Sequence, residues 1–184
     1  MIIEKDINKF AKLFRGNIRS YGRWNPDTQT LSTDKGKVPI ECFKLHLEGG
    51  TGLGIVPITD TDNCYFATID IDAHNDQEKI NLKKIDGLIQ KHDLPIIPCR
   101  SKSGGVHCYV FCKRKIAASL LVAKLMDWAK IIGHPGSEIF PKQTSLSADQ
   151  FGNWINLPYH NDGKIRAALW KGKRLNLSEF ISVA

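Results

Sequence analysis

The sequence predicts an α/β or α+β fold in a single domain of 184 residues, built on a mixed or antiparallel sheet with packed helices. With 42% hydrophobic residues, the chain is long and apolar enough to bury a core. Short runs rich in β-branched and aromatic residues predict strands, and longer segments with apolar residues at helical spacing lie between them. Because tight turns join some of the strand runs, hairpins are expected, which favours an antiparallel or mixed sheet over a purely parallel one.

The first third of the chain predicts two short helices, at residues 4–14 and 39–47, from the spacing of their apolar side chains. The polar residues 25–37 between them predict a loop or an irregular hairpin. Residues 53–58 and 64–72 read as strands and are separated by the turn-forming sequence TDTDN. We therefore expect these two strands to form a hairpin.

The rest of the chain continues the alternation of helices and strands. Residues 75–92 open with Asn75 or Asp76 as a helix cap and repeat Ile and Leu at helical spacing, which predicts a helix packed on the sheet. Residues 117–133 give the strongest helical pattern in the chain. The remaining strand and helix candidates are residues 94–100, 106–113, 137–140, 154–159 and 166–170, and a helical turn at 177–183.

Composition and charge narrow the classes of function. The net charge of +7 and the isoelectric point near 9.2 favour an anionic partner such as nucleic acid or nucleotide phosphate, although an ordinary basic surface gives the same values. No apolar run approaches the roughly 20 residues of a membrane span, and the N-terminus is charged, so a cytoplasmic protein without membrane contact is expected. The five cysteines form no CxxC pair, which argues against a disulfide framework or a zinc finger.

Two aspartates one residue apart, Asp70 and Asp72, interrupt an apolar strand. Side chains alternate across a strand, so both carboxylates share one face, with their Cα atoms about 7 Å apart. Two like charges at this separation raise each other's pKa unless a cation lies between them, and a divalent metal ion is the usual cation. The alternative is that both aspartates face water and cap the turn or helix that follows.

His107 is the second candidate. It follows the turn SKSGG, whose backbone N–H groups, hydroxyl groups and Lys102 ammonium suit a bound triphosphate. Cys108 and Cys112 lie on the other face of the same strand and are not placed to join His107 on zinc. The alternative is a histidine buried among aromatic neighbours in the core.

Glu138 and Lys142 supply a third set of candidates. Glu138 begins a short apolar stretch, where it is either a charge at a strand end or a third carboxylate of a metal site. Lys142 either contacts phosphate or lies on the surface. Each of these residues alone is weak support for a site.

Taken together, these segments resemble the catalytic domain of the archaeo-eukaryotic primase superfamily. The likeness is strongest to the primase-polymerases of TOTE conflict systems and their CRISPR-associated relatives, and it lies in HLEGGTGLGIVPITDTDNCYFATIDID, SKSGGVHCYVF and EIFPKQ…FGNWINLPY. These blocks match an acidic strand, a Ser/Gly turn leading to histidine, and a later carboxylate. The resemblance implies an RRM-like sheet with packed helices in a catalytic part at residues 61–184, and a small N-terminal α/β part at residues 1–60.

The resemblance also assigns roles to the candidates. Asp70 and Asp72 would be the first metal-binding pair and Glu138 the third acidic position, so that these three residues are the predicted catalytic and metal-binding set. His107 would contact the phosphates of the incoming nucleotide. The residues that would support the triphosphate are Ser101, Lys102, Ser103 and Lys142. The chain departs from many relatives in having Gly105 where they have serine, and glutamate rather than aspartate at the third acidic position.

The implied activity is that of a DNA primase and DNA-directed polymerase, a nucleotidyltransferase with a two-ion site for Mg²⁺ or Mn²⁺. Its partners would be a single-stranded DNA template and nucleoside triphosphates, and a fused or associated helicase or a CRISPR or conflict-system protein is a further candidate partner. Two other functions stay open. A metal-dependent nuclease would also use clustered carboxylates but needs no triphosphate-holding turn, and a non-catalytic single-stranded nucleic-acid binding module would leave the aspartate pair unexplained.

Overall fold

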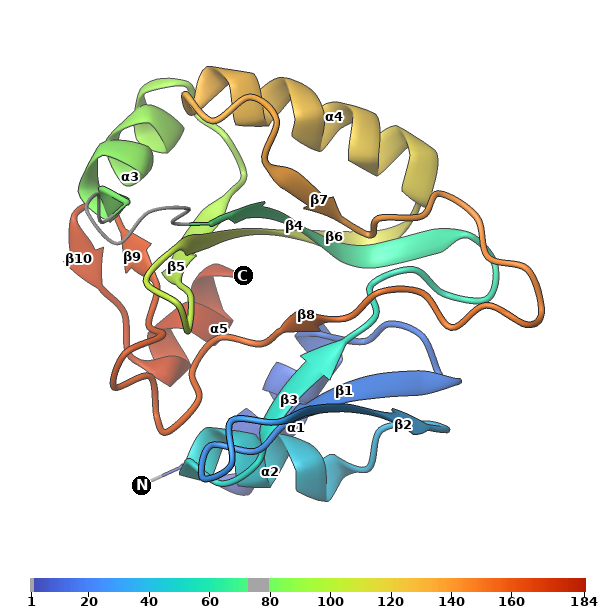
Figure 1. The fold of residues 1–184 in the computed structure, drawn as a ribbon. Coiled ribbons are helices and arrows are strands. Elements are labelled where there is room, and N and C mark those ends of the chain that lie inside the picture. Colours follow the sequence, from blue (N-terminus) through green and yellow to red (C-terminus); the bar gives the residue numbers. More distant parts are fainter. Residues whose placement is uncertain (1, 73–79) are drawn as a thin grey trace.

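The chain folds around two four-stranded sheets in a computed structural model that describes residues 2–72 and 80–184 (Figure 1). Every strand pair among these residues is antiparallel. The first sheet has the strand order β2-β1-β3-β8, and the second has the order β5-β6-β4-β7. Helices and antiparallel sheets together make a mixed α+β fold, which confirms the predicted class.

The first sheet is built mainly from the N-terminal third of the chain. Its elements are α1 (Glu4–Leu13), β1 (Ser20–Trp24), β2 (Leu31–Lys35), α2 (Ile40–Glu48), β3 (Gly52–Ile55) and, from much later in the chain, β8 (Ile155–Asn156). Both predicted helices are confirmed, and the polar stretch between them holds β2, which forms a hairpin with β1. The division of the chain at residue 60 stays a prediction.

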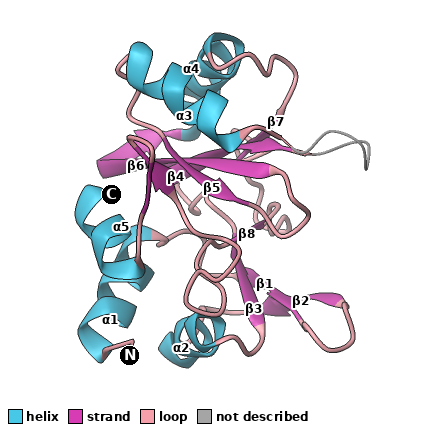
Figure 2. Cartoon of the chain, turned by 90° about the vertical axis from the view of Figure 1, so that its left-hand side faces the viewer, coloured by secondary structure: helices cyan, strands magenta, loops and turns pink. Residues whose placement is uncertain are grey.

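The second sheet is covered on one face by two helices (Figure 2). Its strands are β4 (Asn63–Ile71), β5 (Ile97–Arg100), β6 (Val106–Ala117) and β7 (Glu138–Phe140), and the helices are α3 (Leu82–Lys91) and α4 (Ala118–Ile131). A short ribbon and a last helix complete the described chain: β9 (Leu169–Trp170), β10 (Lys173–Arg174) and α5 (Leu177–Val183). The sequence did not predict β10.

The predicted hairpin of residues 53–58 and 64–72 is wrong, because β3 and β4 lie in different sheets. Pro57 follows β3 and has no N–H group to donate, so the ladder stops there. The preceding Val56 carbonyl accepts a hydrogen bond from the Asn17 N–H at 2.9 Å instead. Only the single bridge from Ile58 to Cys64 remains of the expected pairing.

The start of α3 also differs from the prediction. The expected caps, Asn75 and Asp76, lie outside the described residues, and α3 begins after Asn81, whose side chain accepts a hydrogen bond from the Lys84 N–H at 3.1 Å. Ile85 and Ile89 are buried against the second sheet, as the helical spacing predicted.

The second sheet separates two hydrophobic clusters. Ala67, Ile69 and Ile71 of β4 pack with α3 and α4 on one face, whereas Phe66 and the aromatic side chains of β6 pack with α1, α5 and the first sheet on the other. Burial of each large side chain stabilises the fold by about 1.5–3 kcal/mol. Strand β4 is therefore held on both faces, which fixes the position of its polar end.

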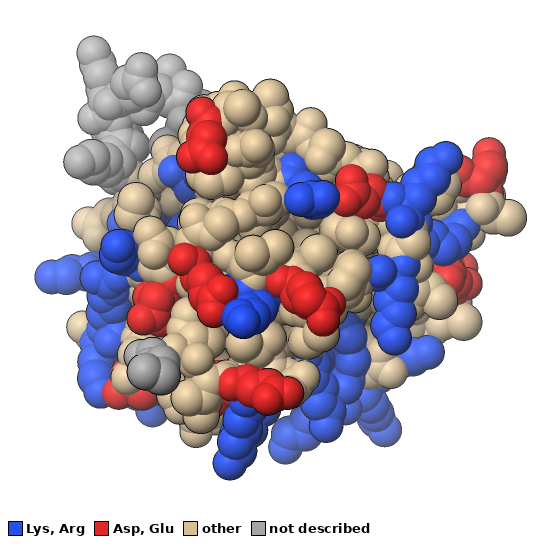
Figure 3. Space-filling view, turned by 90° about the horizontal axis from the view of Figure 1, so that it is seen from below, with Lys and Arg blue, Asp and Glu red and all other residues tan. Residues whose placement is uncertain are grey.

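Charged side chains are unevenly distributed on the surface. Seen from below in Figure 3, acidic side chains lie toward the middle of the face, and lysine and arginine side chains gather along its edges. None of the helices in the described part of the chain is both long enough and apolar enough to cross a bilayer.

His46 ties α2 to two other segments through its buried ring. The Leu53 N–H donates to Nδ1 at 3.0 Å, so Nε2 carries the ring proton and donates to the Pro158 carbonyl at 2.7 Å. Burial lowers the pKa of this imidazole from 6.5 to about 3, and the nearby His160 and Arg166 act in the same direction. The fold therefore requires the neutral form of the His46 imidazole, with Nδ1 as acceptor and Nε2 as donor.

Acid should therefore destabilise the fold through His46. In the unfolded chain the His46 imidazole takes up a proton below pH 6.5, whereas in the folded chain it does so only near pH 3. The free energy of unfolding that the neutral ring contributes above pH 6.5 is therefore lost as the pH falls from 6.5 to 3. The expected slope is roughly 1.4 kcal/mol per pH unit. Urea titrations from pH 7 to pH 4 measure it, and His46→Gln should flatten the curve, whereas His92→Gln, at an exposed histidine, should not. Equal slopes in both variants would contradict the assignment.

Candidate active site

Three predicted site residues stand in one row across the second sheet. In the β4–β6 ladder Asp70 is opposite His107, and in the β4–β7 ladder it is opposite Glu138. Residues directly opposite in an antiparallel pair project from the same face, with Cα atoms about 4.5–5.5 Å apart. Asp72 follows the end of β4 and is exposed. The register therefore brings His107 and Glu138 beside Asp70, and Asp72 to the adjoining strand end.

The Asp70 carboxylate is nearly buried and contacts the histidine ring. Its Oδ1 atom lies 3.2 Å from His107 Nε2, and the two side chains are only 12% and 9% exposed. Oδ1 nevertheless accepts no hydrogen bond from the described residues, so this close contact with the imidazole lacks hydrogen-bond geometry. A buried carboxylate oxygen in this state is costly and is suited to bind a cation.

Tyr109 fixes the orientation of the His107 ring. Burial raises the pKa of Tyr109 well above its usual value, so the side chain keeps its phenolic proton. That proton is donated to the Asn156 carbonyl at 2.6 Å, and the phenolic oxygen is left to accept from His107 Nδ1–H at 3.0 Å. Nε2 therefore faces Asp70. His107 is buried, as the core alternative predicted, and its ring also contacts Asp70.

The turn before His107 is held by Arg100 and by its own backbone. Arg100 Nη1 donates to the Ile80 carbonyl at 2.9 Å and to the Gly104 carbonyl at 2.8 Å. The Ser101 N–H donates to the Gly105 carbonyl at 2.9 Å, and its hydroxyl lies 3.2 Å from that of Ser103. Gly104 has a φ of 89°, which favours glycine. Ser103 and Lys102 are exposed on this turn.

Gly105 lies where the turn approaches the end of β4 most closely. A Cβ atom at this position would collide with the Ile71 carbonyl oxygen and come within 3.3 Å of the Asp72 Cα. The turn therefore packs directly against the acidic end of β4, and a serine at residue 105 would not fit this approach.

Glu138 and Lys142 interact with each other. The Lys142 Nζ lies 2.8 Å from Glu138 Oε2, and the side chains are 38% and 53% exposed. A pair this exposed contributes little stability, typically about 0–1 kcal/mol. Within residues 2–72 and 80–184 no three His, Cys, Asp or Glu side chains are grouped so that they could hold a metal ion. The register places Glu138 beside Asp70, but its carboxylate is bound by Lys142.

Sequence reasoning missed a buried cation on the same side of the sheet. Arg166 is only 4% exposed, and its Nη1 atom has no hydrogen-bond partner among the described residues. Its guanidinium lies 4.8 Å from the centre of the Trp24 ring, and Lys102 Nζ lies 4.6 Å from that ring. Burial lowers the pKa of the Arg166 guanidinium. Partial desolvation also lowers the pKa of the Lys102 ammonium, and the charge of Arg166 is a second cause. The only signal in the sequence is an arginine within an otherwise apolar strand candidate.

Further polar atoms in these elements lack partners. Besides those of Asp70 and Arg166, the unsatisfied buried atoms in the described part of the chain include Thr68 Oγ1, Trp24 Nε1 and Asn156 Oδ1. Thr68 is opposite Tyr109 in the β4–β6 ladder, and the Asn156 carbonyl accepts from Tyr109. Folded proteins rarely leave buried polar atoms unsatisfied, so these atoms are candidates for contacts with water or with a polar ligand.

A comparison with protein families identifies a family for the chain. A family model described as the archaeo-eukaryotic primase domain of the TOTE conflict system matches residues 27–167. The match includes Asp70, His107, Glu138 and Arg166. A search of curated proteins found no match to the chain. Because the family model covers most of its length, the chain belongs to the archaeo-eukaryotic primase domain family of TOTE conflict systems.

Proposed function

We propose that this chain is a template-directed nucleotidyltransferase that synthesises and extends DNA primers on a single-stranded template in the cytoplasm. One observation carries the proposal: a buried carboxylate oxygen of Asp70 without a hydrogen-bond partner and a buried guanidinium of Arg166 without a full set of partners occur around Tyr109. The first is suited to a cation and the second to an anion. A nucleoside triphosphate with its divalent metal supplies both.

The donor set fits Mg²⁺ or Mn²⁺. Both ions prefer oxygen ligands, and Asp70 offers an unsatisfied carboxylate oxygen at the end of a strand fixed on both faces. Asp72 and Glu138 are not grouped with Asp70 around one point in the described structure, so their side chains would have to turn toward Asp70 to complete the set. The exposed pair with Lys142 is weak enough for Glu138 to exchange its partner. When bound, the ions would neutralise phosphate charge and activate the attacking 3′-hydroxyl.

The remaining residues would bind and orient the nucleotide. His107, held by Tyr109, would contact the phosphates, and the hydroxyl groups of Ser101 and Ser103 with Lys102 would support them. Arg166 would add a second cation from another part of the chain. A nuclease would need no such set of triphosphate contacts. The geometry therefore favours nucleotidyl transfer over the nuclease alternative.

Arg166→Met should weaken nucleotide binding without destabilising the apo fold. Removing a charge-assisted contact costs about 1.5–3 kcal/mol, roughly 10- to 100-fold in affinity, while loss of a buried, incompletely bonded cation is neutral or stabilising. Arg100→Met serves as the comparison for stability alone, because Arg100 makes two hydrogen bonds and its loss should lower the melting temperature. Calorimetric titration of a nucleoside triphosphate in Mn²⁺ or in chelator, with thermal melts, measures both effects.

The same titration tests the proposed function. Wild-type protein should bind the triphosphate in Mn²⁺ and only weakly in chelator, because the carboxylates and the phosphates otherwise repel one another. Equal affinity in both conditions would overturn the metal-dependent site. A destabilised Arg166→Met with unchanged nucleotide affinity would remove Arg166 from it.

A further inference from the structure

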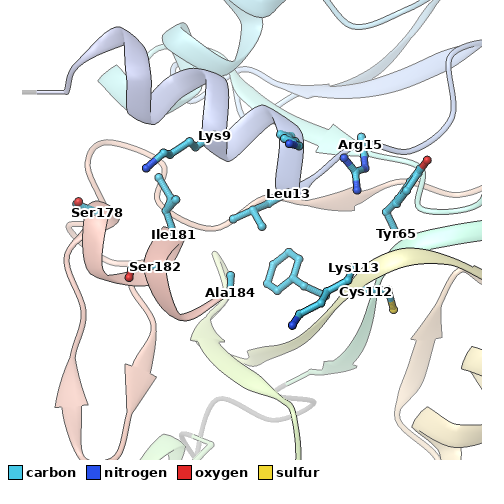
Figure 4. A pocket seen from close by; sticks show the side chains of 12 residues that line it. Lys9, Leu13, Arg15, Tyr65, Cys112, Lys113, Ser178, Ile181, Ser182 and Ala184 are labelled. Atoms are coloured by element: carbon cyan, nitrogen blue, oxygen red, sulfur yellow. The ribbon is translucent and has the colours of Figure 1, made fainter.

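A basic pocket of about 620 Å³ opens between α1, α5 and the β4–β6 pair (Figure 4). We define the basic pocket by its four cationic residues, Lys9, Lys12, Arg15 and Lys113. They come from helix α1, the residues just after it, and strand β6. No aspartate or glutamate is among the described residues that line it. The charged side chains that line this pocket are therefore all of one sign.

The four cations are not neutralised within the described structure. None of them forms an ion pair with an acidic side chain of residues 2–72 or 80–184. Arg15 stacks on Tyr65, with its guanidinium carbon 3.8 Å from the ring centre, and its buried Nε atom has no described hydrogen-bond partner. Because like charges around one pocket repel, a bound polyanion would relieve this repulsion.

The basic pocket is separate from the candidate active site. Phe111 lines the pocket and lies opposite Phe66, whereas His107 lies opposite Asp70 four residues along the same two strands. At about 3.3–3.4 Å per residue, this places the two positions about 13 Å apart along the ladder. The buried Thr68 and Tyr109 pair lies between them. A triphosphate bound beside Asp70 would not fill the basic pocket.

The pocket combines its cations with apolar surface. Leu13, Phe111 and Ile181 are part of its wall, beside the Arg15–Tyr65 stack (Figure 4). Proteins that bind single-stranded nucleic acid combine cations that follow the backbone with aromatic and apolar contacts to the bases. An acidic peptide would satisfy the cations but has no need of an aromatic platform.

We propose that the basic pocket binds the phosphodiester backbone of a single-stranded nucleic acid at a site outside the active centre. The inference takes the chemistry of its partner from the proposed function, as the strand that serves as template. Strand binding at this pocket needs neither nucleotide nor divalent metal, because the four cationic side chains supply the positive charge themselves. Binding measured in chelator therefore tests this site independently of catalysis.

The test compares two triple variants with the same net charge. Lys9→Gln, Lys12→Gln and Lys113→Gln together alter the pocket, and Lys44→Gln, Lys83→Gln and Lys91→Gln together alter exposed lysines on α2 and α3. Fluorescence anisotropy with a labelled oligothymidylate in chelator, over a range of salt concentrations, gives the affinity and its salt dependence. Thermal melts check that both variants are folded.

Losing three phosphate contacts should reduce the slope of log affinity against log salt by about 2. The wild type should therefore lose about 16-fold more affinity than the pocket variant over a fourfold rise in salt. The control should keep the wild-type slope. Inorganic polyphosphate should compete with the oligonucleotide if the phosphates carry the contact. Equal slopes in the two variants would overturn the site, as would tighter pocket-dependent binding of polyglutamate than of the oligonucleotide.

The proposed enzyme function and the proposed strand-binding site can be refuted independently of each other. Asp70→Asn with Asp72→Asn should leave strand binding in chelator unchanged, since neither residue lines the basic pocket. If the wild type makes no primers but the pocket variant still shows the reduced slope, the proposed enzyme function fails and the basic pocket stands. If primers are made but the slopes are equal, only the pocket fails.

Discussion

Replacing Asp70 and Asp72 together by asparagine should reduce primer synthesis and extension by about three orders of magnitude, since metal-dependent stabilisation of the transition state contributes several kcal/mol and each 1.4 kcal/mol is tenfold. The amide oxygens are poorer ligands and carry no charge. Product formation at equal concentrations of folded protein measures the loss. Lys44→Gln, on α2, is a control that should keep full activity.

The same double substitution should leave the apo domain folded and at least as stable. Asp70 Oδ1 is buried and accepts no hydrogen bond from the described residues, so a neutral amide of similar shape removes a desolvation cost. Added Mn²⁺ and nucleotide should then raise the melting temperature of the wild type but hardly that of the variant, because a ligand that binds only the folded state stabilises it. If the aspartates only cap the strand end, the variant will be less stable and its activity will fall only with the folded fraction.

His107→Ala should raise the nucleotide concentration needed for half-maximal synthesis by about 10- to 100-fold, because a contact to charged phosphate is worth about 1.5–3 kcal/mol. The side chain is only 9% exposed, so its removal should also leave a cavity and cost about 1–3 kcal/mol of stability. Nucleotide titrations beside thermal melts separate these effects. A stability loss with unchanged nucleotide dependence would refute the role at the phosphates.

Tyr109→Phe is the matched variant for His107. It keeps the ring of Tyr109 in the core but removes the hydroxyl that accepts from His107 Nδ1 and donates to the Asn156 carbonyl. The imidazole then loses its orientation but remains present. The nucleotide dependence of Tyr109→Phe should therefore lie between those of the wild type and His107→Ala.

Much of the second sheet could be predicted from the sequence because its signals are local. The two-residue alternation along β4 places Phe66, Thr68 and Asp70 on one face and the intervening apolar residues on the other, and the two clusters confirm that division. The strongest helical spacing corresponds to α4. The Ser/Gly turn before His107 was recognisable from its composition alone.

Other features depend on contacts between distant segments and leave little local trace. The segments of β3 and β4 look like a hairpin, but β3 pairs instead with β1 and with β8, about a hundred residues later. Arg166 reaches Trp24 across more than a hundred residues, so neither side chain was recognisable as part of a site. The ion pair of Glu138 with Lys142 depends on side-chain geometry that the predicted roles did not include.

De novo primer synthesis on a single-stranded template tests the central claim most directly. Wild-type protein, template and labelled nucleotides are incubated with Mg²⁺, Mn²⁺ or chelator, with either deoxynucleotides or ribonucleotides, and products are resolved by length. We expect products complementary to the template that appear only with divalent metal and are lost in the Asp70→Asn, Asp72→Asn variant. Absence of product under every nucleotide and metal condition, with the template still bound, would contradict the proposed function and favour a nucleic-acid binding module.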